Sequence, residues 1–214
     1  MFYNEIILLV DGVRLIGDLS IPEGAKSLII FSHGSGSSRL SKRNKQVASY
    51  LQKQEIATLL IDLLTYNEDL NTANRFNIEL LTERLVLVTK WLEAYSTTKG
   101  FAMGYFGAST GAASALSAAV KLPHIFAVVS RGGRPDLALE DLSKVKVPVL
   151  LIVGSKDDEV LALNRKTLDK MRCEKELAIV PGATHLFEEN GCMEKVAELA
   201  CDWFKSHTLS PITL

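Results

Sequence analysis

The 214-residue sequence has few cysteines and no long hydrophobic run, and both absences narrow its possible functions. Its three cysteines, Cys173, Cys192 and Cys201, lack the C-x-x-C spacing of metal and redox sites. We interpret them as inert free thiols, which suits a reducing compartment. No apolar run has the length that spans a bilayer, and the first residues lack the basic segment of a secretion signal. We therefore expect a cytoplasmic protein without a membrane partner.

An excess of charge of one sign is also missing. The 24 Lys and Arg residues against 25 Asp and Glu residues give a formal net charge of −1. This balance creates no overall field that would attract nucleic acid or an anionic membrane. The four histidines are scattered without an H-x-x-x-H pair, so we expect no metal site and no cofactor. Length and a 47% hydrophobic content predict one globular domain over residues 1–214.

Eight short apolar runs predict a mixed, mostly parallel sheet. The first two, residues 6–10 and 14–21, flank an Asp-Gly pair that is typical of a hairpin turn, so they should be antiparallel. The other runs are continuously apolar, as in strands that are buried on both faces. They cover residues 28–31, 56–61, 101–105, 125–129, 147–153 and 177–180.

Helical patterns separate the later runs. Apolar residues recur at helical spacing within residues 78–92, 160–171 and 193–204, and an Ala-rich run covers residues 112–120. Strands that alternate with helices predict an α/β fold with helices on both faces of the sheet. Residues 63–77 are short and polar, so they leave no room for a cap domain and form at most a flap.

The motif GASTG at residues 107–111 lies between the fifth strand and the Ala-rich helix. A G-x-S-x-G motif in that context predicts a nucleophile elbow, in which a sharp turn presents the Ser109 hydroxyl above the sheet. The two glycines are needed because larger side chains would collide with the neighbouring strand or helix. The alternative is a plain turn of small residues between a strand and a helix.

Two further side chains follow strands, and they complete a catalytic set. Asp157 comes after the seventh strand and His185 after the eighth. Serine, acid and histidine in this order match the α/β-hydrolase arrangement. Histidine accepts the serine proton, and a buried carboxylate holds the histidine in the correct tautomer. Asp158 is the alternative acid, and a charge at a helix N-terminus is the alternative role for Asp157.

The glycine-rich turn after the third strand, residues 33–39, is where an oxyanion hole is expected. We assign its two donors to the backbone N–H groups of Ser35 and Thr110. The turn is no P-loop, because no Gly-Lys-Ser/Thr follows, and no dinucleotide fingerprint, because Arg39 replaces the third glycine. His33 is interpreted as a structural hydrogen-bonding group beneath the loop.

Arginines near the expected site are candidates for binding an anionic substrate. Arg131 and Arg134 flank a Gly-Gly turn after the sixth strand, and a guanidinium can grip a carboxylate or a phosphate through two hydrogen bonds. The alternative is that both pair with acids in neighbouring loops, such as Asp136. Arg39 adjoins the oxyanion loop and is a second candidate. The alternative is that Arg39 and Arg43 belong to a solvated basic face.

Together these motifs make the chain resemble the α/β-hydrolase superfamily over nearly its whole length. Within it, the chain looks most like the small, capless dienelactone-hydrolase-like enzymes of bacteria. The resemblance implies an eight-stranded sheet of order 1-2-4-3-5-6-7-8 with strand 2 antiparallel, and it supports Ser109, Asp157 and His185 as the triad. Typical dienelactone hydrolases carry cysteine at the elbow, and this chain carries serine.

The sequence therefore predicts a serine hydrolase that cleaves a small carboxylic ester, thioester or lactone through an acyl-enzyme. One alternative is a non-catalytic protein that binds a small ligand on the same fold. Another is an acyltransferase, in which an alcohol or amine takes the acyl group in place of water.

Overall fold

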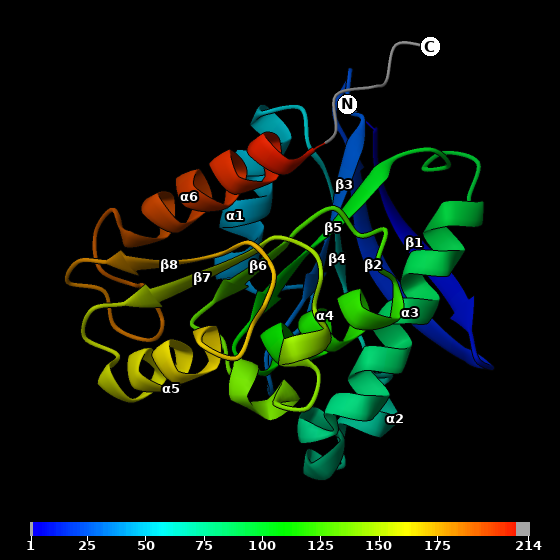
Figure 1. Ribbon diagram of the computed structural model, residues 1–214. Coiled ribbons are helices and arrows are strands. Elements are labelled where there is room, and N and C mark those ends of the chain that lie inside the picture. The colour runs from blue at the N-terminus through cyan, green and yellow to red at the C-terminus, as the bar shows by residue number, and fades with distance from the viewer. Residues whose placement is uncertain (1, 209–214) are drawn as a thin grey trace.

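A twisted sheet forms the centre of the molecule (Figure 1). The computed structural model describes residues 2–208, and in these residues the sheet has eight strands in the order β1-β2-β4-β3-β5-β6-β7-β8. The strands are β1 (Phe2–Val10), β2 (Val13–Ile21), β3 (Ser27–Ser32), β4 (Ala57–Ile61), β5 (Ala102–Ala108), β6 (Val128–Arg131), β7 (Val149–Gly154) and β8 (Lys175–Val180).

β2 runs opposite to both of its neighbours, β1 and β4, whereas all later strand pairs are parallel. The β1–β2 hairpin turns at Asp11 and Gly12, which both have positive φ (47° and 74°), as a tight two-residue turn requires. The strand order, the antiparallel strand 2 and the hairpin are confirmed. This is the α/β-hydrolase fold.

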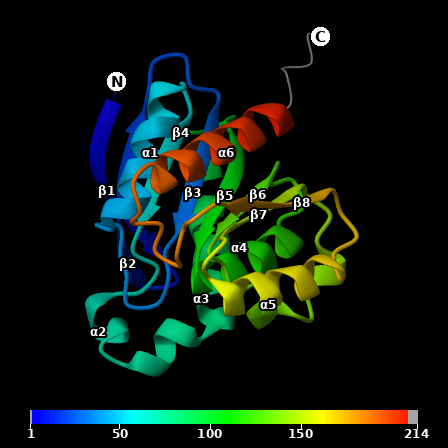
Figure 2. The same ribbon diagram turned by 90° about the vertical axis from the view of Figure 1, so that its left-hand side faces the viewer.

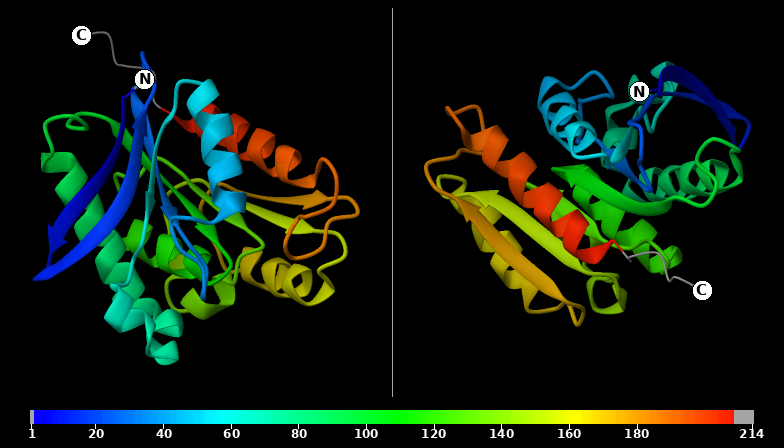
Figure 3. Two further views of the ribbon diagram at one scale, coloured as in Figure 1. Left: turned by 180° about the vertical axis from the view of Figure 1, so that it is seen from behind. Right: turned by 90° about the horizontal axis from the view of Figure 1, so that it is seen from above.

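Helices cover both faces of the sheet (Figures 2 and 3). They are α1 (Lys42–Lys53), α2 (Tyr66–Asp69), α3 (Ile78–Ala94), α4 (Thr110–Lys121), α5 (Asp158–Leu168) and α6 (Cys192–His207). α1 and α6 pack against each other on one face, and α3, α4 and α5 lie on the other. No helix among residues 2–208 is long and apolar enough to cross a membrane.

The central strand β3 shows why the parallel strands are continuously apolar. Leu28 and Ile30 belong to the core cluster that contains residues of α3 and α4. Ile29 and Phe31 belong to the cluster that contains residues of α1 and α6. Each strand residue is therefore buried on one side or the other, so no polar alternation remains.

Two features differ from the sequence-based expectations. β6 covers Val128–Arg131 and not residues 125–129, because its register is set by its neighbours: Arg131 pairs with Ala108 of β5 and Ile152 of β7. Arg131 is thus the last residue of a strand, and not part of the following loop. Residues 63–77 contain helical structure, namely α2 and a 3₁₀ turn, η1 (Thr72–Phe76).

The start of α2 carries a capping motif that was not predicted from the sequence. The Thr65 hydroxyl accepts a hydrogen bond from the Glu68 N–H, and the Glu68 carboxylate accepts one from the Thr65 N–H. This is a capping box, which a T-x-x-E pattern predicts. Arg84 of α3 donates to the same Glu68 carboxylate at 2.7 Å, so the flap is tied to the body of the fold.

Arg39 fastens the β1–β2 hairpin to the rest of the sheet. Its guanidinium pairs with Glu5 at 2.8 Å, with Asp62 at 3.1 Å and with Asp18 at 3.4 Å. Glu5 lies in β1, Asp18 lies in β2, and Asp62 directly follows β4. Arg39 is therefore neither part of a solvated basic face nor free to bind a substrate anion, because three carboxylates already surround it.

We expect Arg39→Met to lower the free energy of unfolding by about 1–3 kcal/mol, because it leaves the buried Asp18 carboxylate without its cation. Urea denaturation followed by circular dichroism measures the change. Lys144→Met is the control: its pair with Asp141 is exposed, so its effect should stay below about 1 kcal/mol. Equal midpoints for both variants would contradict a structural role for Arg39.

Candidate active site

Ser109 lies in a sharp turn between β5 and α4, with φ 51° and ψ −122°. Such a backbone conformation is strained for any residue with a Cβ atom. The flanking glycines make the turn possible. A Cβ on Gly107 would lie 2.5 Å from Ala112 Cα of α4, and a Cβ on Gly111 would lie 2.2 Å from the Ser32 carbonyl oxygen of β3. The expected collisions with helix and strand are both present.

His185 and Asp157 meet beyond the carboxyl ends of β8 and β7. His185 Nδ1 and Asp157 Oδ2 are 2.6 Å apart, and the Asp157 side chain is 11% exposed. Asp157 occupies the N-cap position of α5, but its side chain makes no capping hydrogen bond. Asp158 is exposed in the first turn of α5. Of the two candidate acids, the structure brings Asp157 to the histidine.

The tautomer of His185 follows from this contact. An ionised carboxylate only accepts hydrogen bonds, so Nδ1 carries the proton and Nε2 keeps its lone pair. A histidine in this state is prepared to accept a proton at Nε2.

The loop that carries His185 is anchored to the loop after β7. The Lys156 N–H donates to the Ala183 carbonyl at 2.9 Å, and the Gly182 N–H donates to Ser155 Oγ at 2.8 Å. A Cβ on Gly154 would lie 2.3 Å from the Ala183 carbonyl oxygen. Glycine at the end of β7 therefore lets the two loops touch, which brings the acid to the base.

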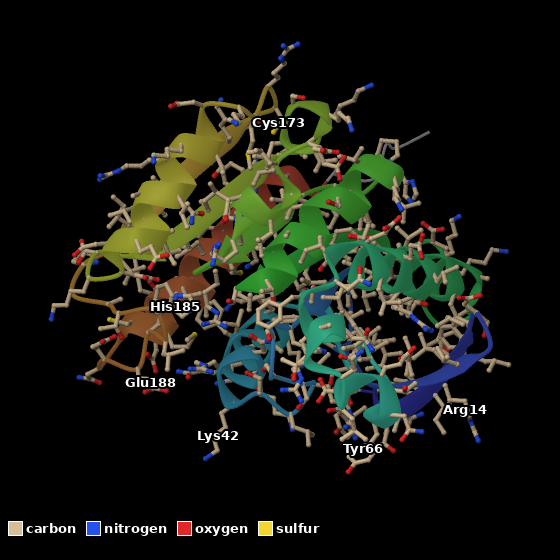
Figure 4. All side chains as sticks on the ribbon, turned by 90° about the horizontal axis from the view of Figure 1, so that it is seen from below. Arg14, Lys42, Tyr66, Cys173, His185 and Glu188 are labelled. Atoms are coloured by element: carbon tan, nitrogen blue, oxygen red, sulfur yellow. The ribbon has the colours of Figure 1, made fainter. Side chains whose placement is uncertain are left out.

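Ser109 and His185 line one cavity of about 120 Å³. Figure 4 shows His185 at the edge of the sheet where the parallel strands end. Among the described residues, the Ser109 hydroxyl makes no hydrogen bond to His185. Such contacts are often loose in a free enzyme and tighten when substrate binds.

The oxyanion loop lies directly on the elbow. A Cβ on Gly34 would lie 3.0 Å from Ser109 Cβ, so the loop backbone approaches Ser109 closely. The Thr110 N–H has no hydrogen-bond partner among the described residues, as expected for a donor of an oxyanion hole. The Ser35 N–H differs from the expectation: it donates to Thr110 Oγ1 at 2.8 Å. The Thr110 hydroxyl accepts this hydrogen bond in the free protein. Most small residues at position 110 would lack such a hydroxyl.

His33 lies beneath this loop and is buried. The Leu63 N–H donates to His33 Nε2 at 3.2 Å, so the proton is on Nδ1, which lies 3.0 Å from the Gly34 carbonyl oxygen. The expected structural role of His33 is confirmed. It connects the oxyanion loop to the chain that leaves β4.

A second cavity of about 270 Å³ adjoins the oxyanion loop on the side of the hairpin. Tyr66, which is 81% exposed on α2, and Arg14 of β2 line it together with Ser37, which also lines the first cavity. Figure 4 shows Tyr66 and Arg14 on this side of the molecule. Neither Tyr66 nor Arg14 was predicted from the sequence to line a cavity. The one sequence signal for the flap that carries Tyr66 is the T-x-x-E pattern, which predicts a helix start there.

Arg131, the last residue of β6, and Arg134 in the loop that follows have different surroundings. Arg134 donates two hydrogen bonds to Asp136, at 2.9 and 2.8 Å, which is the pairing named as the alternative. Arg131 pairs with no carboxylate among the described residues and lines the cavity of Ser109 and His185. Arg43 lines this cavity as well, although its sequence context indicated a solvated face.

The surroundings of the residues that could bind a metal, and of the cysteines, bear on the expectations from the sequence. Among residues 2–208, no three His, Cys, Asp or Glu side chains gather as metal ligands would. Burial raises the pKa of the thiols of Cys173 and Cys201, so both stay protonated. This agrees with their interpretation as inert thiols.

The family model described as "Dienelactone hydrolase family" matches residues 42–208, which is most of the chain. The chain belongs to the dienelactone hydrolase family. The matched range includes the elbow and both residues of the His185–Asp157 pair, and the fold is that of the α/β-hydrolase esterases.

Solved structures resemble this dienelactone hydrolase family member closely. The crystal structure of a dienelactone hydrolase from Anabaena variabilis ATCC 29413 has a TM-score of 0.94 at 49% identity, over 97% of this chain and 99% of that one. Est1E from Butyrivibrio proteoclasticus has a TM-score of 0.81 at 16% identity, over 95% and 98% of the two chains. At that identity, the second likeness concerns the fold alone.

Longer proteins also contain a region like this one. A Mycobacterium tuberculosis protein named "Putative phosphoribosyl transferase" is 50% identical over 209 residues. The alignment covers 97% of this chain and 47% of that protein, so the chain spans about half the length of the curated relatives it matches.

We expect Ser109→Gly to be more stable than Ser109→Ala by about 1 kcal/mol, because glycine adopts φ 51° without the strain of a Cβ atom. Both variants lack the hydroxyl, so their difference isolates the backbone strain. Thermal denaturation measures it. Ala112→Gly, in the regular turn of α4 that follows, is the control and should lower the stability by about 1 kcal/mol. Destabilisation by glycine at both positions would show that the elbow stores no strain.

Proposed function

We propose that this chain is a cytoplasmic serine hydrolase that cleaves a small carboxylic ester, thioester or lactone through an acyl-enzyme. One observation carries the proposal: Ser109, on a strained elbow, shares a cavity with His185, whose Nδ1 lies 2.6 Å from Asp157. Membership of the dienelactone hydrolase family supports hydrolysis, and three free cysteines, two of them buried, support a reducing compartment.

In the proposed acylation, His185 Nε2 takes the proton of the Ser109 hydroxyl while Oγ attacks the carbonyl carbon of the substrate. Asp157 holds the ring and stabilises the imidazolium that forms. The tetrahedral intermediate then expels its alcohol or thiol, which leaves with the proton of His185. For a lactone, the leaving alcohol stays attached to the acyl group.

Deacylation repeats these steps with water. His185 takes a proton from the water as its oxygen attacks the acyl-enzyme, and it returns the proton to Ser109 Oγ when the acid leaves. In both acylation and deacylation, the oxyanion accepts a hydrogen bond from the Thr110 N–H. The Ser35 N–H is the proposed second donor, and it becomes available when the Thr110 hydroxyl turns away from it.

The surroundings of the cavity favour a small substrate. The flap of α2 and η1 is the only insertion at this end of β4 among the described residues, and it lines the neighbouring cavity without closing the first one. Serine at the elbow, where typical family members carry cysteine, favours hydrolysis of ordinary esters over that of dienelactone itself.

Phosphoribosyl transfer, the activity in the printed name of the Mycobacterium tuberculosis relatives, is not what the site of this chain favours. More than half of those proteins lies outside the aligned region. In this chain, the glycine-rich loop lacks the Gly-Lys-Ser/Thr of a phosphate cradle and lies against a nucleophile elbow.

A panel of p-nitrophenyl esters, thioesters and lactones, assayed in parallel with fluorophosphonate labelling, tests the proposal. A burst of product equal to the amount of protein indicates an acyl-enzyme. A non-catalytic ligand-binding protein would give neither burst nor labelling. An acyltransferase would give the burst but would turn over faster when an alcohol or amine acceptor is added.

We expect Ser109→Ala to abolish fluorophosphonate labelling and His185→Ala to lower kcat by several orders of magnitude. The two groups work as a unit, so the double variant should be little worse than either single one. Labelling followed by mass spectrometry of the modified peptide makes the measurement. Retained labelling of Ser109→Ala would mean that another residue is the nucleophile.

We expect Asp157→Asn to lower kcat by roughly four orders of magnitude, because an amide can stabilise the wrong tautomer of His185. Asp158→Asn is the matched control: it removes the adjacent charge and should leave kcat nearly unchanged, with a loss of stability below about 1 kcal/mol. The reverse order of the two effects would assign the acid to Asp158.

A further inference from the structure

Arg131 is a buried cation without a counter-ion. The residue is 6% exposed, and its guanidinium carbon lies 5.8 Å from the centre of the Phe187 ring. Its Nε is buried without a hydrogen-bond partner, and no carboxylate within residues 2–208 forms an ion pair with it. Arg134, three residues later, is bound by Asp136. The fold thus gives Arg134 a carboxylate partner and leaves Arg131 without one among the described residues.

Burying a charge without a partner costs free energy of folding, so the presence of Arg131 at this position requires a reason. Burial and, to a smaller extent, the like charge of Arg43 together lower the pKa of Arg131 to about 10. The guanidinium still carries its proton at neutral pH. The Phe187 ring offers a weak cation–π contact, which falls short of the interaction that a carboxylate or phosphate provides.

The charge is next to the proposed chemistry. Arg131 lines the same cavity of about 120 Å³ as Ser109 and His185. Its backbone carbonyl accepts the Ser109 N–H at 3.2 Å, and a Cβ on the following Gly132 would lie 3.5 Å from His185 Cε1. A group bound by Arg131 would therefore be close to the carbonyl that Ser109 attacks.

Arg43 supplies a second positive charge to the lining of this cavity. It comes from the first turn of α1, and its only ion pair among the described residues is with Glu188, at 3.4 Å. The Glu188 side chain is 69% exposed, so this pair is weak and a ligand anion can replace it. Figure 4 shows Glu188 on the same loop as His185, near Lys42 at the start of α1.

We infer that Arg131 and Arg43 form a subsite for an oxyanion group, a carboxylate or a phosphate, that the substrate carries close to its scissile ester. The inference rests on the proposed hydrolase function for the position of the ester. Two cations from different elements around a small cavity suit one compact anion, and not a polyanion, which would need an extended basic face. The bound anion completes the coordination of Arg131 and displaces Glu188 from Arg43.

Binding is measured first, without turnover, in the Ser109→Ala variant. Isothermal titration calorimetry with inorganic phosphate, succinate and the neutral succinamide shows which anion binds. We expect phosphate, succinate or both to bind and succinamide not to bind. Adding Arg131→Gln should weaken binding about 10- to 100-fold, the range for lost hydrogen bonds to a charged group. Arg134→Gln, already paired with Asp136, is the control and should leave binding unchanged.

Turnover is measured second, in the wild-type chain, with two p-nitrophenyl esters of equal length, one ending in a carboxylate and one in an amide. We expect kcat/KM to be about 10- to 100-fold higher for the anionic ester. Arg131→Gln should remove this preference mainly through KM, and Arg43→Gln should reduce it in a salt-dependent manner. Lys42→Gln is the matched control for Arg43→Gln, because Lys42 is exposed and does not line this cavity.

The outcomes separate the two proposals. Equal rates on both esters with no anion binding would overturn the subsite and leave the hydrolase function intact. Anion binding that depends on Arg131, without hydrolysis of any ester, would support the subsite and overturn the hydrolase function. If Arg131→Gln does not fold, Arg131→Lys and Arg43→Gln decide, and unchanged binding in both would overturn the subsite.

Discussion

The contact between the first turn of α4 and the end of β3 is the constraint on which the site depends. At Gly111, the helix backbone approaches the Ser32 carbonyl so closely that a single methyl group would not fit. A hydrogen bond of 2.8 Å between the hydroxyls of Ser32 and Ser114, both fully buried, holds the same two elements together. Because strand and helix are this close, the loop after β3 has to pass over Ser109. Ser109 and the amides beside it are therefore positioned by one close contact.

Most of the fold was predictable, because local sequence signals agree with the overall topology. Asp11-Gly12 determines the hairpin, and continuous apolar runs such as Leu28–Phe31 identify strands that are buried on both faces. The ends of β6 were not predictable, since its register depends on pairing with β5 and β7, which lie apart from it in sequence. The helical turn at Tyr66 was missed because four residues are too few to show periodicity, although its capping pattern was present.

Within the site, residue types and their order along the chain were sufficient to predict the elbow at Ser109 and the contact between Asp157 and His185. The sequence did not distinguish the arginines, because their roles depend on which acids the fold brings to them. Arg39 is held by carboxylates from three separate segments, Arg134 by a neighbour two residues away, and Arg131 by none that the structure describes. The hydrogen bond from the Ser35 amide to Thr110 was equally hidden, since it joins residues that are distant in sequence.

The position of α6 has a consequence for the order in which the molecule is assembled. Val196 and Phe204 of α6 belong to the core cluster that contains Val129 of β6 and Ile152 of β7, so this face of the later strands lacks α6 until residues 192–207 have been made. The close contacts of Gly107 and Gly111 at the elbow join β3, β5 and α4, all of which lie before residue 122. During synthesis from the N-terminus, the serine is thus in place long before its histidine exists. The cavity that both residues line is completed only when the loop with His185 and Leu186 has been made.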